Sequence, residues 1–184
     1  MKDILISKLG KKSILLPKES TIKVEGDSLL VSGPKGSQKI LFNQNIFSSK
    51  INEKNEFQIS PIKKDKNTSL MWGTYRSLVN NAVVGVTKGH EKNLELSGVG
   101  FRASLKGDQL VLLLGFSHEV KYSIPKGITV KVEKQTKLNI VGSDKELVSK
   151  VAADIKSLKP VEPYKAKGIK EKNQYVIRKE GKKK

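Results

Sequence analysis

The side chains best suited to catalysis or metal binding are the two histidines, and neither stands in a recognisable pattern. His90 and His118 lie far apart in the sequence, and no carboxylates accompany them at ligand or acid–base spacing. The chain contains no cysteine, which excludes a disulfide framework and a thiolate metal site. We therefore expect two isolated surface or turn histidines and no metal site.

Two short motifs resemble fragments of ligand-binding sites but lack the required context. The G-x-G of SGVG (97–100) continues into FRASL, which has the pattern of a strand, whereas a dinucleotide cradle must open a helix. These glycines instead favour a β-bulge or a close approach of backbone. The S-x-x-K pairs that begin at Ser20, Ser32 and Ser123 have no companion motif, and no Walker A sequence is present. The sequence therefore predicts a protein that is not an enzyme and that uses no cofactor and no small-molecule substrate.

Positive charge is the strongest functional signal in the composition. The 184 residues include 36 Lys and Arg against 18 Asp and Glu, a net charge of +18. Residues 159–184 alone hold ten basic and three acidic side chains. This excess predicts a polyanionic partner, and nucleic acid is the first candidate. An anionic membrane surface is the second, although the C-terminal residues lack the apolar helix face that it needs. A lysine-rich composition without such a partner is the third.

Nothing in the sequence indicates insertion into a membrane. No segment approaches the roughly 20 consecutive apolar residues that span a bilayer. The stretch MKDILISKLGKKSILLPKES (1–20) has no apolar run followed by a small-residue cleavage site, and Asp3 is unlike an uncleaved organellar transit peptide. We expect no membrane partner and a cytoplasmic location, with an organelle as the alternative.

The segment KPVEPYKAKGIK (159–170) has residue types that a purely electrostatic tail does not need. Lys165, Lys167, Lys170 and Lys172 are spaced by one or two other residues, just after a Pro-Tyr pair. Proline favours extended backbone, so we expect these lysines to be spread along a line. Tyr164 can stack on an unpaired base or a sugar, or alternatively pack back on the second domain. Gly168 can let the backbone approach a phosphate. The last residues, 178–184, form either a flexible basic arm that orders on binding or a solvated tail.

An internal repeat divides the chain. LPKESTIKVEGDSLLVSG (16–33) and IPKGITVKVEKQTKLNIVG (124–142) share P-K, then T-[IV]-K-V-E, then alternating apolar residues that end in glycine. The alternation predicts two half-buried antiparallel strands joined by a tight turn in each copy. In the first copy this turn is Gly26-Asp27, and the second copy has one inserted residue. The repeat indicates duplication of a small domain, because its period is far too long for a solenoid.

One helix is expected after each repeated strand pair. In the second copy, Ser143 and Glu146 match a capping box, and the helix should stop before Pro160. In the first copy, Thr68 or Ser69 is the expected cap of a helix that ends near residue 85. The expected core face of the first helix is Met71, Tyr75, Leu78, Val79 and Ala82. That of the second is Leu147, Val148, Val151, Ala152, Ile155 and Leu158.

Further strands are expected at 39–42, 56–60, 93–105 and 109–116, so strands and helices follow one another twice. This order is typical of an α+β protein. We predict two duplicated small domains, each a mostly antiparallel sheet with one packed helix, plus a basic C-terminal extension. Their expected bounds are 1–82, 83–158 and 159–184. The uncovered face of each sheet would be left for a partner.

Several blocks resemble one known family. VEPYKAKGIK (161–170) is similar to P-E-P-Y-K-G-K-G-I, the C-terminal signature of the bacterial-type large-subunit ribosomal protein six family, and it departs from it at Val161 and Ala166. Glu119 stands where the family more usually has proline. Three longer stretches resemble the family in order and spacing, and they are WGTYRSLVNNAVVGVTKG (72–89), ELSGVGFRASLKGDQLVLLLGFSHEV (95–120) and GSDKELVSKVAADIKSLKP (142–160).

The resemblance implies a structural, non-enzymatic component of the large ribosomal subunit with two duplicated α+β domains. It implies binding to 23S-type ribosomal RNA close to the sarcin–ricin loop and the base of the flexible stalk, where translation factors dock. Neighbouring large-subunit ribosomal proteins would be further partners. The ribosome would be cytoplasmic or, alternatively, organellar. A free RNA-binding regulator or RNA chaperone is the alternative function.

The resemblance also implies which residues contact the RNA. By motif position, Tyr164, Lys165, Lys167 and Gly168 would lie at the contact. His118, in the GFSH turn, and Arg102 are further candidates. The remaining expected contacts are basic residues of the C-terminal extension, namely Lys170, Lys172, Arg178, Lys179, Lys182, Lys183 and Lys184.

Overall fold

The computed structural model describes residues 7–52, 55–63 and 65–181, which divide into two compact units between Gly89 and His90. Each unit combines antiparallel sheets with one helix, so the predicted α+β fold is confirmed. The boundary expected at residue 82 falls inside the helix of the first unit. Within the described ranges, no helix is long and apolar enough to cross a membrane.

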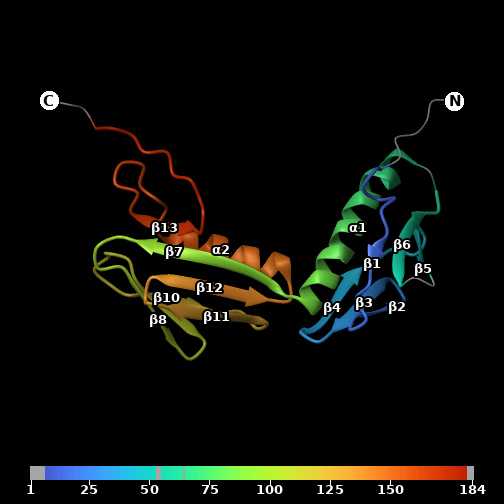
Figure 1. Ribbon diagram of the computed structural model, residues 1–184, viewed down its shortest axis with the longest axis horizontal. Coiled ribbons are helices and arrows are strands. Elements are labelled where there is room, and N and C mark those ends of the chain that lie inside the picture. Colours follow the sequence, from blue (N-terminus) through green and yellow to red (C-terminus); the bar gives the residue numbers. More distant parts are fainter. Residues whose placement is uncertain (1–6, 53–54, 64, 182–184) are drawn as a thin grey trace. The chain divides into compact units, whose positions relative to one another are not determined.

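The first unit contains two three-stranded sheets and a long helix (Figure 1). Its elements are β1 (Ile14–Leu15), β2 (Thr21–Glu25), β3 (Ser28–Gly33), β4 (Gly36–Leu41), β5 (Phe47–Ile51), β6 (Glu56–Pro61) and α1 (Lys66–Thr87). One sheet has the order β1-β6-β5 and the other β2-β3-β4. Because α1 packs against β3, β4 and β6, both sheets share one core with the helix.

The start of α1 differs from the prediction. The residue before the helix is Asp65, whose side chain makes no capping hydrogen bond. Thr68 lies within the first turn and is buried, and Ser69 follows it inside the helix. Neither residue is therefore the cap, because the helix begins earlier than the apolar pattern indicates.

The buried face of α1 is also rotated relative to the prediction. Met71 and Leu78 are each 42% exposed, so their assignment to the core was wrong. Trp72 takes the core position instead, and its indole Nε1 donates to the carbonyl oxygen of Ile59 at 2.7 Å. Gly10 lies so close to this ring that an added Cβ would approach it to 2.4 Å. The remaining core residues of the helix include the predicted Val79 and Ala82, with Tyr75 packed against the cluster.

The second unit pairs a four-stranded sheet with a three-stranded one and a single helix (Figure 1). Its elements are β7 (His90–Ser97), β8 (Arg102–Lys106), β9 (Gln109–Leu113), β10 (Val120–Ser123), β11 (Ile128–Glu133), β12 (Lys137–Gly142), α2 (Lys145–Leu158) and β13 (Gly168–Glu171). The sheet orders are β11-β12-β7-β13 and β10-β9-β8. The strand expected at 93–105 is thus two strands, which the SGVG segment separates.

The helix α2 begins at a different cap from the one predicted. Asp144 is the N-cap, and its side chain accepts a hydrogen bond from the amide of Glu146 at 2.8 Å. Ser143 therefore does not form the expected capping box. An aspartate at this position also places a negative charge at the positive end of the helix dipole. The helix ends at Leu158, before Pro160, as predicted.

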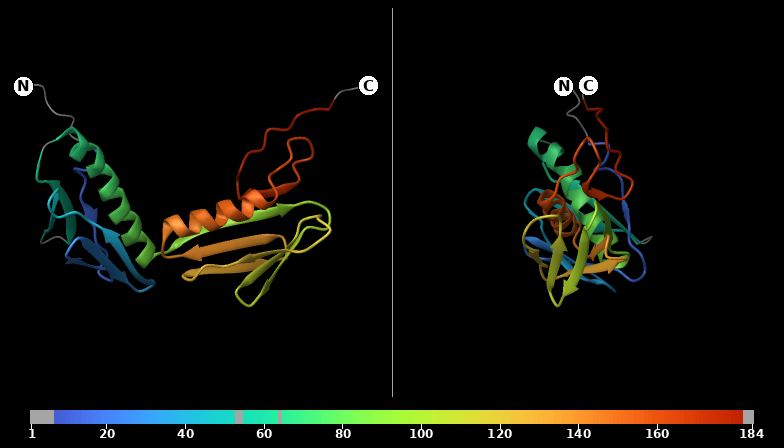
Figure 2. Two further views of the ribbon diagram at one scale, coloured as in Figure 1. Left: turned by 180° about the vertical axis from the view of Figure 1, so that it is seen from behind. Right: turned by 90° about the vertical axis from the view of Figure 1, so that its left-hand side faces the viewer.

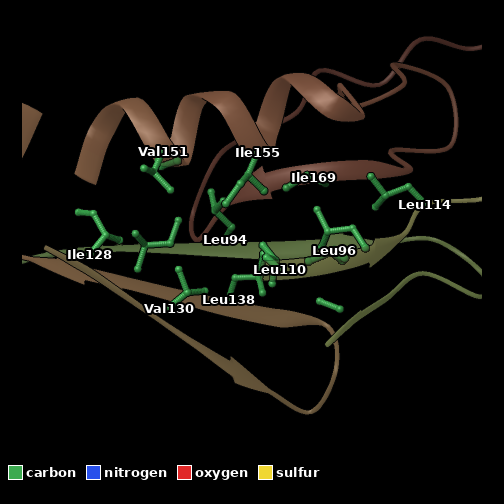
Figure 3. Close-up of a cluster of buried hydrophobic side chains, with 14 of the residues drawn as sticks. Leu94, Leu96, Leu110, Leu114, Ile128, Val130, Leu138, Val151, Ile155 and Ile169 are labelled. Carbon is green, nitrogen blue, oxygen red and sulfur yellow. The ribbon is translucent and has the colours of Figure 1, made fainter. Parts of the chain in front are cut away.

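In the second unit α2 lies along one face of the sheet that contains β7 and β12 (Figure 2), and the core lies between the helix and this sheet (Figure 3). Val151 and Ile155 of the helix meet Leu94 of β7 in this cluster, and Ile155 is completely buried. Leu110 and Leu112 of β9 belong to the same cluster, so the three-stranded sheet is part of one core with α2. Of the predicted helix stripe, Leu147 is 37% exposed and was wrongly assigned to the core.

The two repeated segments form the predicted hairpins. β2 pairs with β3 from Thr21 opposite Ser32 to Glu25 opposite Ser28, which leaves Gly26 and Asp27 as the turn. β11 pairs with β12 up to Glu133 opposite Lys137. The inserted residue of the second copy therefore lies in the turn 134–136, where it changes no strand pairing.

The C-terminal extension is not a separate tail over its whole length. β13 pairs antiparallel with β7, and Ile169 is fully buried in the core of the second unit. The amide of Lys172 donates to the carbonyl oxygen of Asn93 at 2.9 Å, just past the end of this strand. Residues 159–172 thus belong structurally to the second unit, because an apolar residue of the extension completes its core.

Candidate nucleic-acid interface

Four connecting segments of the second unit meet at one end of its sheets. Ser97, the last residue of β7, pairs with Gly168, and Arg102, the first residue of β8, pairs with Leu113. The amide of Ala103 donates to the carbonyl oxygen of Gln135 at 2.8 Å. We call this region the loop end, which consists of the segments 98–101, 114–119, 134–136 and 159–168 with Arg102. Predicted site residues more than 60 positions apart, such as Arg102 and Tyr164, therefore belong to segments at the same end of the unit.

The segment 159–168 forms a closed loop, which we call the tail loop. The amide of Glu162 donates to the carbonyl oxygen of Lys167 at 2.8 Å, and the amide of Ala166 donates back to Glu162 at 3.0 Å. Ala166 has a φ of +54°, so the chain turns here. The expectation of an extended line of lysines is therefore wrong for this segment, because internal hydrogen bonds fold it into a turn.

Gly168 has a role in the fold of the chain itself. Its φ is +140°, and an added Cβ would lie 2.7 Å from the carbonyl oxygen of Pro160 and the Cα of Val161. Backbone from both sides of the tail loop thus meets at this glycine. The predicted approach of Gly168 to a phosphate stays a prediction.

The tail loop presents its aromatic and basic side chains to solvent. Tyr164 is 54% exposed, which disfavours the alternative that it packs back on the second domain. Lys165 and Lys167 are also exposed. The structure thus presents three of the predicted contact residues together on one short loop.

Of the next two predicted lysines, one lies on the sheet and the other directly follows it. Lys170 belongs to β13, and its ammonium lies 3.6 Å from the carboxylate of Glu95. Lys172 follows the strand and is exposed. The charge of Lys170 is partly balanced by its neighbour, so it contributes less positive potential than the lysines of the tail loop.

The chain returns to the tail loop near its C-terminus. The amide of Lys179 donates to the carbonyl oxygen of Pro163 at 3.0 Å, and Arg178 and Lys179 are both exposed. This contact adds two predicted basic residues to the surroundings of Tyr164. Lys182, Lys183 and Lys184 lie outside the described residues.

Glu171 ties the base of the tail loop to two other elements. It accepts a hydrogen bond from the ammonium of Lys92 on β7 at 3.0 Å, and the ammonium of Lys156 on α2 lies 3.6 Å away. The hydrogen bond from Lys92 holds the pKa of Glu171 below its ordinary value, although partial burial opposes this shift. The strand that anchors the tail loop is therefore held by ion pairs as well as by the buried Ile169.

Two residues of the loop end, Phe116 and Lys159, were not predicted from the sequence as contact residues. Phe116 is 42% exposed, and its ring stacks on that of predicted His118 with centroids 6.1 Å apart. The ammonium of Lys159 lies 4.6 Å from the centre of the Phe116 ring. Phe116 could have been chosen from the sequence, because it lies between Gly115 and the predicted His118 in the same turn. Its contact with Lys159 could not, because only the tertiary fold brings these two residues together.

The exposed groups of the loop end can bind an anion-rich ligand. Among the residues that the structure describes, no group of three or more His, Cys, Asp and Glu is positioned to hold a metal ion. What the loop end presents is exposed cations beside exposed aromatic rings. This combination suits phosphates and bases, since cations supply affinity and rings supply stacking.

Comparison with known proteins identifies the family. The model of the family described as ribosomal protein L6 matches residues 16–89 and again 97–172, one stretch in each unit. A protein of Rhodopseudomonas palustris (strain BisA53), named large ribosomal subunit protein uL6, is 45% identical over 97% of this chain and 100% of its own length. Proteins of the same name from a Nitratiruptor species and from Thioalkalivibrio sulfidiphilus (strain HL-EbGR7) are each 44% identical. They match 96% and 97% of this chain over 98% and 100% of their own lengths.

These matches show that the chain belongs to the ribosomal protein L6 family. The resemblance that the sequence motifs indicated is confirmed. The family is one of structural proteins without enzymatic activity, so the prediction that this chain is not an enzyme is confirmed as well.

Proposed function

We propose that the chain is a structural constituent of the large ribosomal subunit that binds 23S-type ribosomal RNA through the loop end of its second unit. The observation that carries this proposal is the tail loop, where Tyr164, Lys165 and Lys167 stand exposed on backbone that internal hydrogen bonds fix. The family to which the chain belongs supports the identity of the RNA.

The RNA site lies near the sarcin–ricin loop and the stalk base, with neighbouring ribosomal proteins and translation factors close by. The ribosome is that of the cytoplasm, with an organellar ribosome as the alternative. The extension from residue 159 onwards is the RNA-binding part, and its first half gains its shape from the sheet of the second unit.

Binding combines a general and a specific contribution. Lysines of the tail loop displace counterions from closely spaced phosphates, which gives affinity and a strong dependence on salt. The loop end is fixed to the core through Ile169 and Glu171, so these charges keep their spacing in the absence of RNA. Rigid spacing sets the register on folded RNA, and an RNA chaperone that serves many RNAs does not need it.

The test compares equal changes of charge at the two ends of the second unit. In full-length protein, Lys165→Gln with Lys167→Gln should weaken binding to large-subunit ribosomal RNA and reduce the salt slope by about 1.5, since each phosphate contact contributes roughly 0.7–0.9. Lys106→Gln with Lys126→Gln is the matched control. Both lysines are exposed and lie away from the loop end, since Lys106 is the last residue of β8 and Lys126 precedes β11. An unchanged slope for the first pair contradicts the proposal. Equal affinity of the wild type for unrelated RNAs favours the free RNA-binding regulator or chaperone.

A further inference from the structure

Phe116 is an exposed aromatic residue in a turn that its neighbours hold in one conformation. Leu114 before it is fully buried, and Gly115 between them has a φ of +75°. This left-handed conformation turns the chain outward directly after the core residue. Phe101, which is only 8% exposed, lies beside both Gly115 and Gly98, where an added Cβ would meet its ring at 3.4 Å and 2.9 Å. The segments 98–101 and 114–119 are therefore packed on one shared side chain.

The surroundings of Phe116 are aromatic and cationic. The ring of His118 is nearly parallel to that of Phe116, with an interplanar angle of 19°. The ammonium of Lys159 lies over the Phe116 ring, in the range of a cation–π interaction. The backbone of Lys159 is fixed in turn, because its carbonyl oxygen accepts a hydrogen bond from Ile169 at 3.0 Å. Three side chains from two segments thus form one surface whose parts are held by separate contacts.

An exposed aromatic pair has little value for binding phosphates alone. The bases of a continuous RNA duplex are stacked on one another, and their faces are not accessible to a protein ring. An unpaired or looped-out base exposes its face and can stack on an aromatic side chain, while a cation beside the ring meets its phosphate. The chemistry of the surface thus fits a nucleotide that has left the helix.

We propose that Phe116 and His118, with Lys159, form a stacking site for an unpaired nucleobase, so that the loop end prefers RNA with an extruded nucleotide over continuous duplex. This inference rests on the proposed function and adds to it the RNA feature that this surface recognises. Phe116 is the residue that determines this preference. The lysines of the tail loop supply affinity for either form of RNA.

The test uses two RNA hairpins that differ by one nucleotide. One is fully paired, and the other carries a single bulged 2-aminopurine, whose fluorescence is quenched when it stacks. Wild-type full-length protein should bind the bulged hairpin about tenfold more tightly than the paired one, within the range of one base–aromatic stack. Phe116→Leu keeps an apolar side chain but removes the ring. It should abolish both the quenching and the preference, with no change in the salt slope, because no cation is lost.

Two further variants separate this role from a structural one. Phe116→Tyr keeps the ring and should retain the preference for the bulged hairpin. If Phe116→Leu acted only by loosening the turn, the presence of a ring would not decide the preference. Tyr175→Leu removes another exposed aromatic residue, one that is 86% exposed in the C-terminal segment, and should leave the preference intact. Preference retained by Phe116→Leu, or absent from the wild type, overturns the inference. If the wild type lacks the preference but the tail-loop lysines still determine the salt slope, the inference fails and the proposed function stands. Wild-type protein that does not bind large-subunit RNA overturns the proposed function itself.

Discussion

The backbone amide of Ile169 donates a hydrogen bond to the carbonyl oxygen of Lys159, 3.0 Å away, and this bond closes the loop that carries Tyr164. Ile169 is fully buried, while the side chain of Lys159 extends to the exposed ring of Phe116. One hydrogen bond therefore links the core of the second unit to the surface that we propose for RNA. It follows that changes behind the surface should alter RNA binding through the shape of the tail loop.

Gly168→Ala is the first such change. Alanine at a φ of +140° is strained, and its Cβ would lie 2.7 Å from the backbone of Pro160 and Val161, which cannot move without opening the tail loop. We expect the free energy of unfolding of the second unit to fall by about 1–3 kcal/mol. Urea denaturation followed by circular dichroism measures this loss.

The matched control is Gly181→Ala. Apart from its chain neighbours, no described atom lies within 4 Å of a Cβ placed at Gly181, so this alanine should leave the stability unchanged. If both variants unfold at the same urea concentration as the wild type, the tail loop is not held closed at Gly168. Gly168→Ala should also bind large-subunit RNA less tightly than the wild type, although the two proteins have the same charge.

The ion pairs of Glu171 predict a dependence of stability on pH. Because the hydrogen bond from Lys92 lowers the pKa of Glu171 in the folded state, its contribution to stability is fully present above the ordinary value of 4.5. This contribution is lost as the pH falls through the depressed folded-state pKa. The side chain is 37% exposed, so we expect only about 0.2–1 kcal/mol from these pairs.

Glu171→Gln should therefore lower the stability near neutral pH and flatten its decline below pH 4.5, as measured by urea midpoints across that range. Glu180→Gln is the control, because that side chain is exposed in the C-terminal segment. If the two variants show the same dependence of stability on pH, the ion pairs of Glu171 do not stabilise the fold.

The hairpins were predictable from the sequence because their signal is local. Alternation of apolar and polar residues fixes which face of a strand is buried, and the turn Gly26-Asp27 fixes the register. The position of α1 was less predictable, because Trp72, Met71 and Leu78 all fit an apolar stripe. The hydrogen bond from Trp72 to Ile59 determines which of these residues is buried. Because Ile59 lies in β6, the sequence of the helix alone does not reveal this contact.

The site was predictable by residue type but not by shape. Tyr164, Lys165 and Lys167 could be chosen from their motif, and the structure presents them on one exposed loop. The turned backbone of this loop was missed. Two prolines suggested extension, whereas hydrogen bonds from Glu162 to Lys167 and from Ile169 to Lys159 close the loop. Phe116 was overlooked for a similar reason. Its neighbour in space, Lys159, follows the end of α2 and lies far along the chain.

The division into two units predicts that they unfold separately. Ile155→Asp places a carboxylate in a fully buried position of the second core and should cost several kcal/mol, on the order of 3–5, which is enough to unfold a small domain. The only tryptophan of the chain is Trp72, which lies in the core of the first unit, so its fluorescence reports on that unit alone. We expect Ile155→Asp to lose part of its circular dichroism in water while the urea transition of Trp72 stays at its wild-type midpoint. Ile155→Val is the mild counterpart, which keeps the core apolar and should retain both signals. If Ile155→Asp shifts the Trp72 transition as far as it lowers the circular dichroism, the two units do not fold independently, and the second core supports the first.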